Sequence, residues 1–313
     1  MDILTAENLN KTFYDNVALN NLNLSIPKQS IYGLLGPNGA GKSTFIRIVN
    51  QIIDADSGAI MLNGEKLSPN HIGTIGYLPE ERGLYKKMKV GEQLLYLAQL
   101  KGLSNKEAKR RIKEWLERFG ASDWLGKKVE DLSKGMQQKV QFIATVMHEP
   151  ELIILDEPFS GFDPINANLI KEEILKLREK GSTIIFSTHR MESVEELCDN
   201  IALINKAEKI LEGKKDEIKE QFKSHIYSID YTGEPLAKEG NYELLTTDTD
   251  LNGIHHSRLR IHEGATSTQL LQEILDQNFE ILAFKEEIPS ISDIFIKLVK
   301  ENPLEIEAEA SHS

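Results

Sequence analysis

The spacing of apolar and polar residues changes several times along the chain, and each change predicts a different kind of element. Apolar and polar residues alternate over 18–26, which is typical of a strand with one buried face. The apolar run at 31–35 predicts a second strand. Two continuous apolar runs, at 152–155 and 184–186, predict strands buried on both faces of a parallel sheet. The beginning of the chain is therefore expected to be rich in β-structure, and residues 150–205 to alternate strands, loops and helices.

Between about 85 and 130 the apolar positions recur with the spacing of an α-helix. Ser104 and Glu107 have the spacing of a capping box, in which two side chains satisfy free N–H groups at the start of a helix. Gly120 falls where that helix would end. We interpret the apolar stripe between them as core packing without chemistry; it comprises Ala108, Ile112, Trp115, Leu116 and Phe119.

The composition shifts after the charged stretch 212–217, and the pattern beyond it predicts a small α+β domain over about 222–300. Its expected strands are 225–231, 242–247, 257–262 and 281–286, and its expected helices are 266–276 and 290–300. The acidic stretch 301–313, rich in small residues, is predicted to be a disordered tail. A larger domain is expected over 1–220.

Composition narrows the class of protein. With 313 residues, the chain is long enough for about two domains, and its 40% hydrophobic and 27% charged residues are ordinary for a globular protein. No apolar run is long enough to cross a bilayer, and the first residues lack the features of a signal peptide. A net charge of −12 argues against a nucleic-acid partner and against electrostatic binding to an anionic membrane. The single cysteine, Cys198, cannot form an internal disulfide, which fits a reducing cytosol.

Residues 36–44 fit the phosphate-binding pattern G-x-x-x-x-G-K-[ST], between a predicted strand and a stretch compatible with a helix. The glycines let backbone N–H groups turn inward around an anion, and the helix N-terminus adds partial positive charge. Lys42 is expected to reach the outer phosphates of a nucleotide, and the Ser43 hydroxyl to ligate Mg²⁺. The residues predicted to hold the phosphates are Gly36, Pro37, Asn38, Gly39, Ala40, Gly41, Lys42, Ser43 and Thr44.

A phosphate-binding loop alone is compatible with a kinase, a GTPase or a transport ATPase, so motifs further along the chain decide. Asp156 and Glu157 directly follow the apolar run 152–155, a Walker B pattern. They stand at the carboxyl end of a predicted strand, where α/β sheets place their ligands. Asp156 is expected to orient Mg²⁺, and Glu157 to polarise the water that attacks the nucleotide.

The segment 132–138, Leu-Ser-Lys-Gly-Met-Gln-Gln, resembles the LSGGQ signature of ATP-binding cassette (ABC) ATPases. Ser133 can cap the helix that follows, so that its hydroxyl and the neighbouring N–H groups form an anion-binding terminus. Together with the earlier motifs, residues 1 to about 220 resemble the nucleotide-binding domain of an ABC transporter. This resemblance implies an α/β fold with a RecA-like core, an antiparallel β subdomain and a helical subdomain over about 85–135. It also implies ATP and Mg²⁺ as ligands.

The same resemblance implies further site residues. Phe13 falls where the family has an aromatic residue that stacks on adenine, and Tyr14 is a neighbouring candidate. Glu80 falls at the Q-loop, where a carboxylate could ligate Mg²⁺. Residues 160–163 match the D-loop, and His189 matches the switch histidine. The catalytic set implied is Lys42, Glu157 and His189, and Ser133 and Gly135 join the nucleotide-binding set.

Three departures from the family pattern stand out. The Q-loop position holds Glu80 where the family has glutamine, which adds negative charge beside a triphosphate. The signature holds Lys134 and Met136 at positions where glycine and glutamine are usual, and the D-loop holds Phe162 in place of leucine. Lys134 could offset the charge of Glu80. None of these changes removes a group that the chemistry needs, so an active ATPase is expected.

Two segments indicate the branch of the family. Residues 75–85 and 291–295 resemble ABC ATPases that serve export permeases, including those similar to bacterial sodium-efflux systems. The small domain at 222–300 resembles the accessory domain of that branch. The resemblance implies efflux of an ion or a small molecule.

The family mechanism implies partners. Two cassettes pack head to tail, so this chain, with one set of motifs, is expected to form a homodimer in which Ser133 and Gly135 of one subunit contact the γ-phosphate held by Lys42 of the other. A separate membrane permease is implied, which would place the chain at the cytoplasmic face of the membrane. Tyr85, Lys86 and Met88 are candidates for the docking surface.

Other functions remain open at this point. One is a soluble ABC ATPase that acts on ribosomes or DNA, although the chain has neither two cassettes nor long heptad arms. A second is an ATP-dependent binding switch without turnover, for which Glu80 and the altered signature are the support. A third is an import ATPase, against which the accessory domain and the export-like segments argue.

Overall fold

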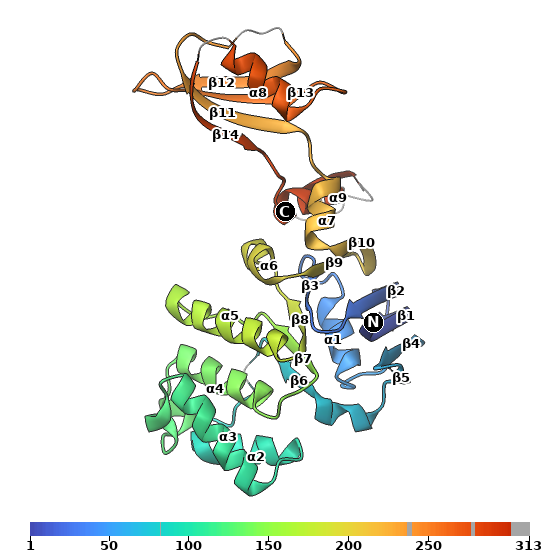
Figure 1. Ribbon diagram of the computed structural model, residues 1–313. Helices are drawn as coiled ribbons and strands as arrows, with labels where there is room; N and C mark the ends of the chain where they lie inside the picture. The colour runs from blue at the N-terminus through green and yellow to red at the C-terminus, as the bar shows by residue number, and fades with distance from the viewer. Residues whose placement is uncertain (82, 237–239, 277–278, 302–313) are drawn as a thin grey trace, which may run out of the picture. The chain divides into compact units, whose positions relative to one another are not determined.

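The computed structural model describes residues 1–81, 83–236, 240–276 and 279–301. It divides into two compact units, Met1–Lys215 and Asp216–Ser313, each described by itself below (Figure 1). The tail predicted to be disordered lies, from residue 302 onward, outside the described residues.

An antiparallel sheet forms one part of the first unit. Its strands, in the order β2-β1-β4-β5, are β2 (Asn16–Pro27), β1 (Asp2–Phe13), β4 (Ser57–Leu62) and β5 (Glu65–Lys66). Apolar side chains from one face of it, including Leu4, Leu22 and Ile60, join the main core. The alternation seen in the sequence at 18–26 therefore corresponds to a strand with one buried face, as predicted.

The second sheet of this unit positions the site. Its strands, in the order β10-β9-β3-β8-β7-β6, are β10 (Glu208–Lys214), β9 (Asn200–Asn205), β3 (Ile31–Leu35), β8 (Thr183–Ser187), β7 (Leu152–Asp156) and β6 (Ile75–Leu78). Neighbouring strands are parallel except for β10, which runs antiparallel to β9. Every residue of β3, β7 and β8 is buried. The continuous apolar runs thus mark the strands of a parallel sheet, as predicted.

The helices of the first unit fall into two groups (Figure 1). Three helices follow strands of the parallel sheet: α1 (Lys42–Val49), α5 (Pro164–Glu179) and α6 (Met191–Leu197). Three others form the helical subdomain: α2 (Val90–Leu100), α3 (Asn105–Arg118) and α4 (Lys134–Val146). Short 3-10 turns span Pro69–Thr74, Ser122–Trp124 and Val129–Asp131.

Helix α3 has the buried stripe, the Ser104 cap and the terminal glycine that the sequence predicted, but Glu107 has different partners from those of a capping box. Its apolar stripe is buried, and Gly120 adopts a left-handed φ of 61° just beyond the helix, where a side chain would be strained. The Ser104 hydroxyl accepts from the Glu107 N–H at 3.3 Å, as a cap should. The Glu107 carboxylate, however, pairs with Arg110 and Arg111, both at 2.6 Å, because two full charges attract it more strongly than a backbone N–H does.

The second unit is the small α+β domain predicted from the sequence. Its antiparallel sheet has the order β12-β13-β11-β14, with strands β12 (Tyr242–Thr249), β13 (His255–Ile261), β11 (Ile226–Thr232) and β14 (Glu280–Glu286). Its helices are α7 (Lys215–Gln221), α8 (Ser267–Leu275) and α9 (Ile291–Glu301). The core packs Tyr231 and Leu259 of the sheet with Leu270 of α8. The α/β fold with an additional C-terminal domain is confirmed.

Candidate nucleotide-binding site

The phosphate-binding loop connects the end of β3 to the start of α1, and its backbone geometry explains its glycines. Gly36 and Gly41 have φ values of 149° and 114°, in the region that disfavours other residues. A Cβ atom on Gly36 would lie 2.1 Å from the carbonyl oxygen of Ile204, and one on Gly41 would lie 2.4 Å from that of Ala18. No side chain fits at either position, so the loop requires glycine there.

A cavity of about 380 Å³ lies over this loop. It is lined by Phe13, Asn16, Ala18, Asn38, Gly39, Ala40, Gly41, Lys42, Ser43, Thr44 and Glu80. Phe13 is 38% exposed and presents an aromatic ring at the rim, whereas Tyr14 does not line the cavity. Residues from β1, the loop and the segment after β6 therefore converge, and most of the predicted nucleotide-binding residues lie together.

Lys42 is the first residue of α1, and its side chain reaches back to the start of the loop. Its Nζ donates to the carbonyl oxygens of Gly36 at 2.7 Å and Pro37 at 2.9 Å. Burial lowers the pKa of Lys42, while the negative charges of Glu157, Asp156 and Glu80 act to raise it. The ammonium group is thus held at the loop by oxygen atoms, which the oxygens of a phosphate can replace.

Asp156 is the last residue of β7 and is only 6% exposed. Burial raises its pKa, the negative charges of Glu80 and Glu157 raise the pKa further, and the positive charge of Lys42 acts to lower it. A cation bound beside Asp156 would offset the repulsion from Glu80 and Glu157. Of the three residues predicted to hold Mg²⁺, Ser43 and Glu80 line the cavity and Asp156 does not. Their hydroxyl and carboxylate oxygens are the kind of ligand that suits Mg²⁺ in company with phosphate oxygens.

Glu157 follows directly, with a left-handed φ of 48° that few non-glycine residues adopt. Its backbone N–H donates to the carbonyl oxygen of Ser187 at 2.9 Å. The carboxylate is bonded by the His189 N–H at 2.8 Å, the His189 Nδ1 at 2.6 Å and the Thr188 hydroxyl at 3.1 Å. The structure therefore brings Glu157 and His189 together, and it adds Thr188, which the sequence did not single out.

Ser133 and Gly135 lie elsewhere in the unit, at the start of α4. The Ser133 hydroxyl accepts from the Met136 N–H at 3.3 Å, which is the cap that the sequence predicted. A Cβ atom placed on Gly135 would lie 3.8 Å from the ring of Phe162, so the substituted D-loop residue borders the signature. Neither Ser133 nor Gly135 lines the cavity over the phosphate-binding loop of its own chain.

The candidate docking residues lie at the start of the helical subdomain. Tyr85 is 58% exposed, and its ring lies 6.4 Å from that of Tyr96, edge to face. The backbone carbonyls of Lys86 and Met88 accept from Glu130 and Val129 at 2.9 and 3.0 Å, which fixes this segment to the rest of the subdomain.

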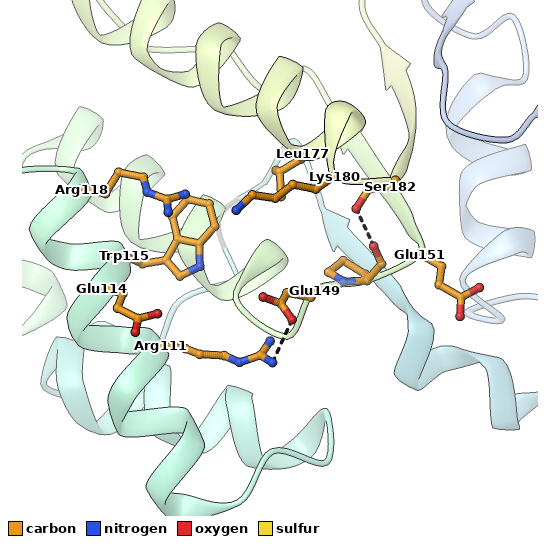
Figure 2. A pocket seen from close by; sticks show the side chains of 11 residues that line it. Arg111, Glu114, Trp115, Arg118, Glu149, Glu151, Leu177, Lys180 and Ser182 are labelled. Atoms are coloured by element: carbon orange, nitrogen blue, oxygen red, sulfur yellow. Dashed lines mark hydrogen bonds and ion pairs between the residues drawn. The ribbon is translucent and has the colours of Figure 1, made fainter.

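A second cavity in this unit, of about 570 Å³, is shown in Figure 2. It is bordered by Pro150 and Ser182, which precede β7 and β8. The cavity therefore lies at the N-terminal ends of these strands, and Asp156 lies at the opposite, C-terminal end of β7. Arg111 pairs with Glu149 at 2.9 Å, and Arg118, which stacks over Trp115, pairs with Glu173 at 3.0 Å. None of the predicted site residues lines this larger cavity. These ion pairs join α3 to the loop before β7 and to α5. We therefore interpret this cavity as part of the packing between these elements.

A phosphate-binding loop, an Asp-Glu strand end with a histidine beside it and a helical subdomain that carries a capped signature define an ATPase of the ABC class. Comparisons with known proteins agree. A family model described as "ABC transporter" matches residues 19–160, and one described as "ATP-binding protein DrrA1-3-like, C-terminal domain" matches residues 213–299.

Individual relatives cover almost the whole chain. The uncharacterized ABC transporter ATP-binding protein YhaQ of Bacillus subtilis is 43% identical over 95% of this chain and 98% of its own length. The linearmycin resistance ATP-binding protein LnrL of the same organism is 32% identical over 95% of this chain and 98% of its own. A solved structure, described as the ATP-binding subunit of an ABC transporter, has a TM-score of 0.67 at 31% identity, over 70% of this chain and 93% of its own.

The chain therefore belongs to the ABC transporter ATP-binding proteins. It is an ABC ATPase, for which ATP binding and hydrolysis are expected. Within the described ranges, the helices are too short or too polar to span a membrane.

Proposed function

We propose that this chain is the ATP-hydrolysing subunit of an exporter and that it acts as a head-to-tail homodimer on a separately encoded membrane permease. The observation that carries the proposal is the separation of two motifs. Ser133 and Gly135 stay outside the cavity that Lys42 occupies in the same chain, so a second copy is needed to complete each ATP site. A name such as linearmycin resistance protein supports export, because a resistance transporter protects a cell by removing the compound.

In this proposal the cavity over the phosphate-binding loop holds ATP. Phe13 stacks on the adenine, and the backbone N–H groups of the loop surround the phosphates. Lys42 exchanges its bonds to the loop carbonyls for bonds to the outer phosphates. Ser43, Asp156 and Glu80 would hold Mg²⁺, which when bound neutralises charge on the phosphate oxygens.

Hydrolysis needs a base, and Glu157 is placed to serve as one. Its carboxylate is fixed by donors at 2.8 and 3.1 Å, from the His189 N–H and the Thr188 hydroxyl, so it can accept a proton from a water molecule without reorienting. The His189 ring, now on Glu157, turns to the γ-phosphate once ATP is bound. Tighter binding of ATP than of ADP by the closed dimer then supplies the change in population that drives the permease.

The permease is proposed to dock on the helical subdomain, near Tyr85, Lys86 and Met88, which would place the chain on the cytoplasmic face of the membrane. A neighbouring cleft of about 230 Å³ has a largely apolar lining that includes Leu84 and Leu97. The Oε1 atom of Gln141, also in that lining, is buried without a hydrogen-bond partner in the described structure. A permease segment with an apolar side chain and an N–H donor would satisfy both features.

The head-to-tail arrangement is tested by mixing two inactive variants. Lys42→Ala removes a phosphate contact from one side of each ATP site, and Gly135→Asp places a negative charge on the other side. The Gly135 position has room for a Cβ atom, so the second variant should fold. Mixed at equal concentration, they should recover about a quarter of wild-type ATP hydrolysis, because half of the dimers are mixed and each has one intact site of two. No recovery in the mixture, with both variants folded, would count against a shared site.

Glu80→Gln should raise the affinity for metal-free ATP and lower the affinity for Mg²⁺. The substitution keeps an oxygen ligand but removes a negative charge near the triphosphate, so ATP should bind about 3- to 10-fold more tightly without metal. The affinity for Mg²⁺ should fall by a similar factor. Calorimetric titrations with ATP, in EDTA and then in Mg²⁺, measure both effects. Glu81→Gln is the matched control, since Glu81 is exposed and does not line the cavity. Equal metal-free affinity in wild type and Glu80→Gln would remove Glu80 from the site.

A further inference from the structure

We infer that Thr188 is a positioning residue for ATP hydrolysis: its hydroxyl fixes the carboxylate of Glu157 while His189 is engaged with the nucleotide. This inference rests on the proposed role of Glu157 as the base. It adds a residue whose contribution is not visible in any of the sequence motifs.

The hydrogen bonds around Thr188 determine where its proton points. A threonine hydroxyl has one proton to donate. The Thr188 oxygen already accepts from the Arg190 N–H at 3.0 Å, and it lies 3.1 Å from Glu157 Oε2. Since an ionised carboxylate can only accept, the hydroxyl proton goes to Glu157. The Arg190 N–H thus orients the hydroxyl, and the hydroxyl orients the carboxylate.

The position of Thr188 makes this contact rigid. The residue directly follows β8, is 1% exposed, and stands one place beyond Ser187, which is paired in register with Asp156 on β7. Parallel pairing of β7 with β8 therefore fixes the distance between the Thr188 hydroxyl and the Glu157 side chain.

The other side chain that holds Glu157 cannot serve throughout the reaction. The His189 ring contacts Glu157 Oε1 at 2.6 Å, but in the proposed mechanism it moves to the γ-phosphate. After the ring leaves, the fixed donors are the His189 N–H on Oε1 and the Thr188 hydroxyl on Oε2. Thr188 is then the side chain that prevents the carboxylate from rotating away from the water.

The test compares Thr188→Val, which keeps the shape and loses the hydroxyl, with Thr188→Ser, which keeps the hydroxyl. In single-turnover hydrolysis of Mg²⁺-ATP by the full chain, we expect Thr188→Val to lower the rate constant about 10- to 100-fold, the effect of one hydrogen bond to a charged group. The dissociation constant for ATP should stay within about threefold, and Thr188→Ser should recover most of the rate.

Thr183→Val is the matched control, because Thr183 begins the same strand, is also fully buried, and accepts a hydrogen bond from the Gln29 N–H at 2.8 Å. It should leave the rate constant near that of wild type. Three results would each overturn the inference: a wild-type rate in Thr188→Val, an equal loss in Thr188→Ser, or an equal loss in Thr183→Val.

A double variant separates this inference from the assignment of the base. With Glu157→Gln in place, adding Thr188→Val should not slow hydrolysis further, because the group that Thr188 positions has lost its function. A further loss of 10-fold or more would show that Thr188 acts elsewhere. If Glu157→Gln alone hydrolyses ATP at nearly the wild-type rate, the proposed function of Glu157 fails, and that result does not depend on Thr188.

Discussion

Glu157→Gln should lower ATP hydrolysis by about 10²–10⁴-fold, the usual contribution of a positioned general base, while ATP binding is retained. Glutamine has nearly the same shape, and its single oxygen can still accept from the His189 N–H, which now bonds Oε1 at 2.8 Å. Its NH₂ group takes the place of Oε2, which now accepts from Thr188 at 3.1 Å. It cannot take a proton from water. Because Lys42 and the glycine loop are unchanged, the phosphates should be bound as before.

This prediction is checked by steady-state hydrolysis and by equilibrium binding of Mg²⁺-ATP to the same preparation. Glu151→Gln serves as the control, since Glu151 precedes the same strand at its opposite end and bonds Asn63 at 2.7 Å. Hydrolysis within a few-fold of wild type in Glu157→Gln would contradict the assignment of the base. Loss of ATP binding would instead mean that the carboxylate supports the site structurally.

The same variant should reveal the dimer. If hydrolysis reopens the closed state, a chain that binds ATP without hydrolysing it should accumulate in that state. Light scattering after chromatography in Mg²⁺-ATP should then show a larger dimer fraction for Glu157→Gln than for wild type. A monomer at all ATP concentrations would argue against the head-to-tail arrangement.

The parallel sheet could be predicted from the sequence because strands buried on both faces leave continuous apolar runs, as residues 152–155 of β7 do. Helix α3 was recognisable for a similar reason, since its buried positions share one face. The long strand β1 gave no such signal. Its pairing with β2 and β4 shifts register at several points, so its apolar and polar residues do not alternate regularly.

In the candidate site, too, some features could be predicted from the sequence and others could not. The residues at the phosphate-binding loop could be found because they are consecutive and because only glycine fits at Gly36 and Gly41. The contact of Thr188 with Glu157 could not, because it joins residues 31 positions apart and depends on the register of β7 with β8. The spacing of Ser104 and Glu107 also did not predict that the Glu107 carboxylate would pair with Arg110 and Arg111 in place of a backbone N–H, because that depends on which nearby charges compete for it.

For the signature residues, the sequence predicts the local structure but not the assembly of two chains. Ser133 was correctly predicted to cap a helix, a local property of the chain. That a second molecule should bring Ser133 to ATP follows from the family resemblance and from its absence from the lining of the cavity, and it stays a proposal. A helix cap can be derived from a single sequence because it depends on a few consecutive residues. The packing of two copies depends on surfaces formed by residues that are far apart in the sequence.

Lys42→Ala should weaken ATP binding by about 10- to 100-fold, because it removes a charge-assisted hydrogen bond to the outer phosphates. The ammonium group is already buried at the loop, where Glu157, Asp156 and Glu80 favour its charged form. Without it, those carboxylates would face the triphosphate with less positive charge to balance them. The loss should therefore exceed that caused by removing an exposed lysine.

Binding is best measured by calorimetry in a Glu157→Gln background, where ATP is not consumed during the titration. Lys28→Ala provides the control, since Lys28 is exposed just beyond β2 and does not line the cavity. Lys42→Ala should also stay monomeric in Mg²⁺-ATP, because the closed dimer requires bound nucleotide. Tight ATP binding by Lys42→Ala would contradict the phosphate-binding role of the loop, because the burial of this lysine would then serve the fold alone and the nucleotide would have to bind elsewhere.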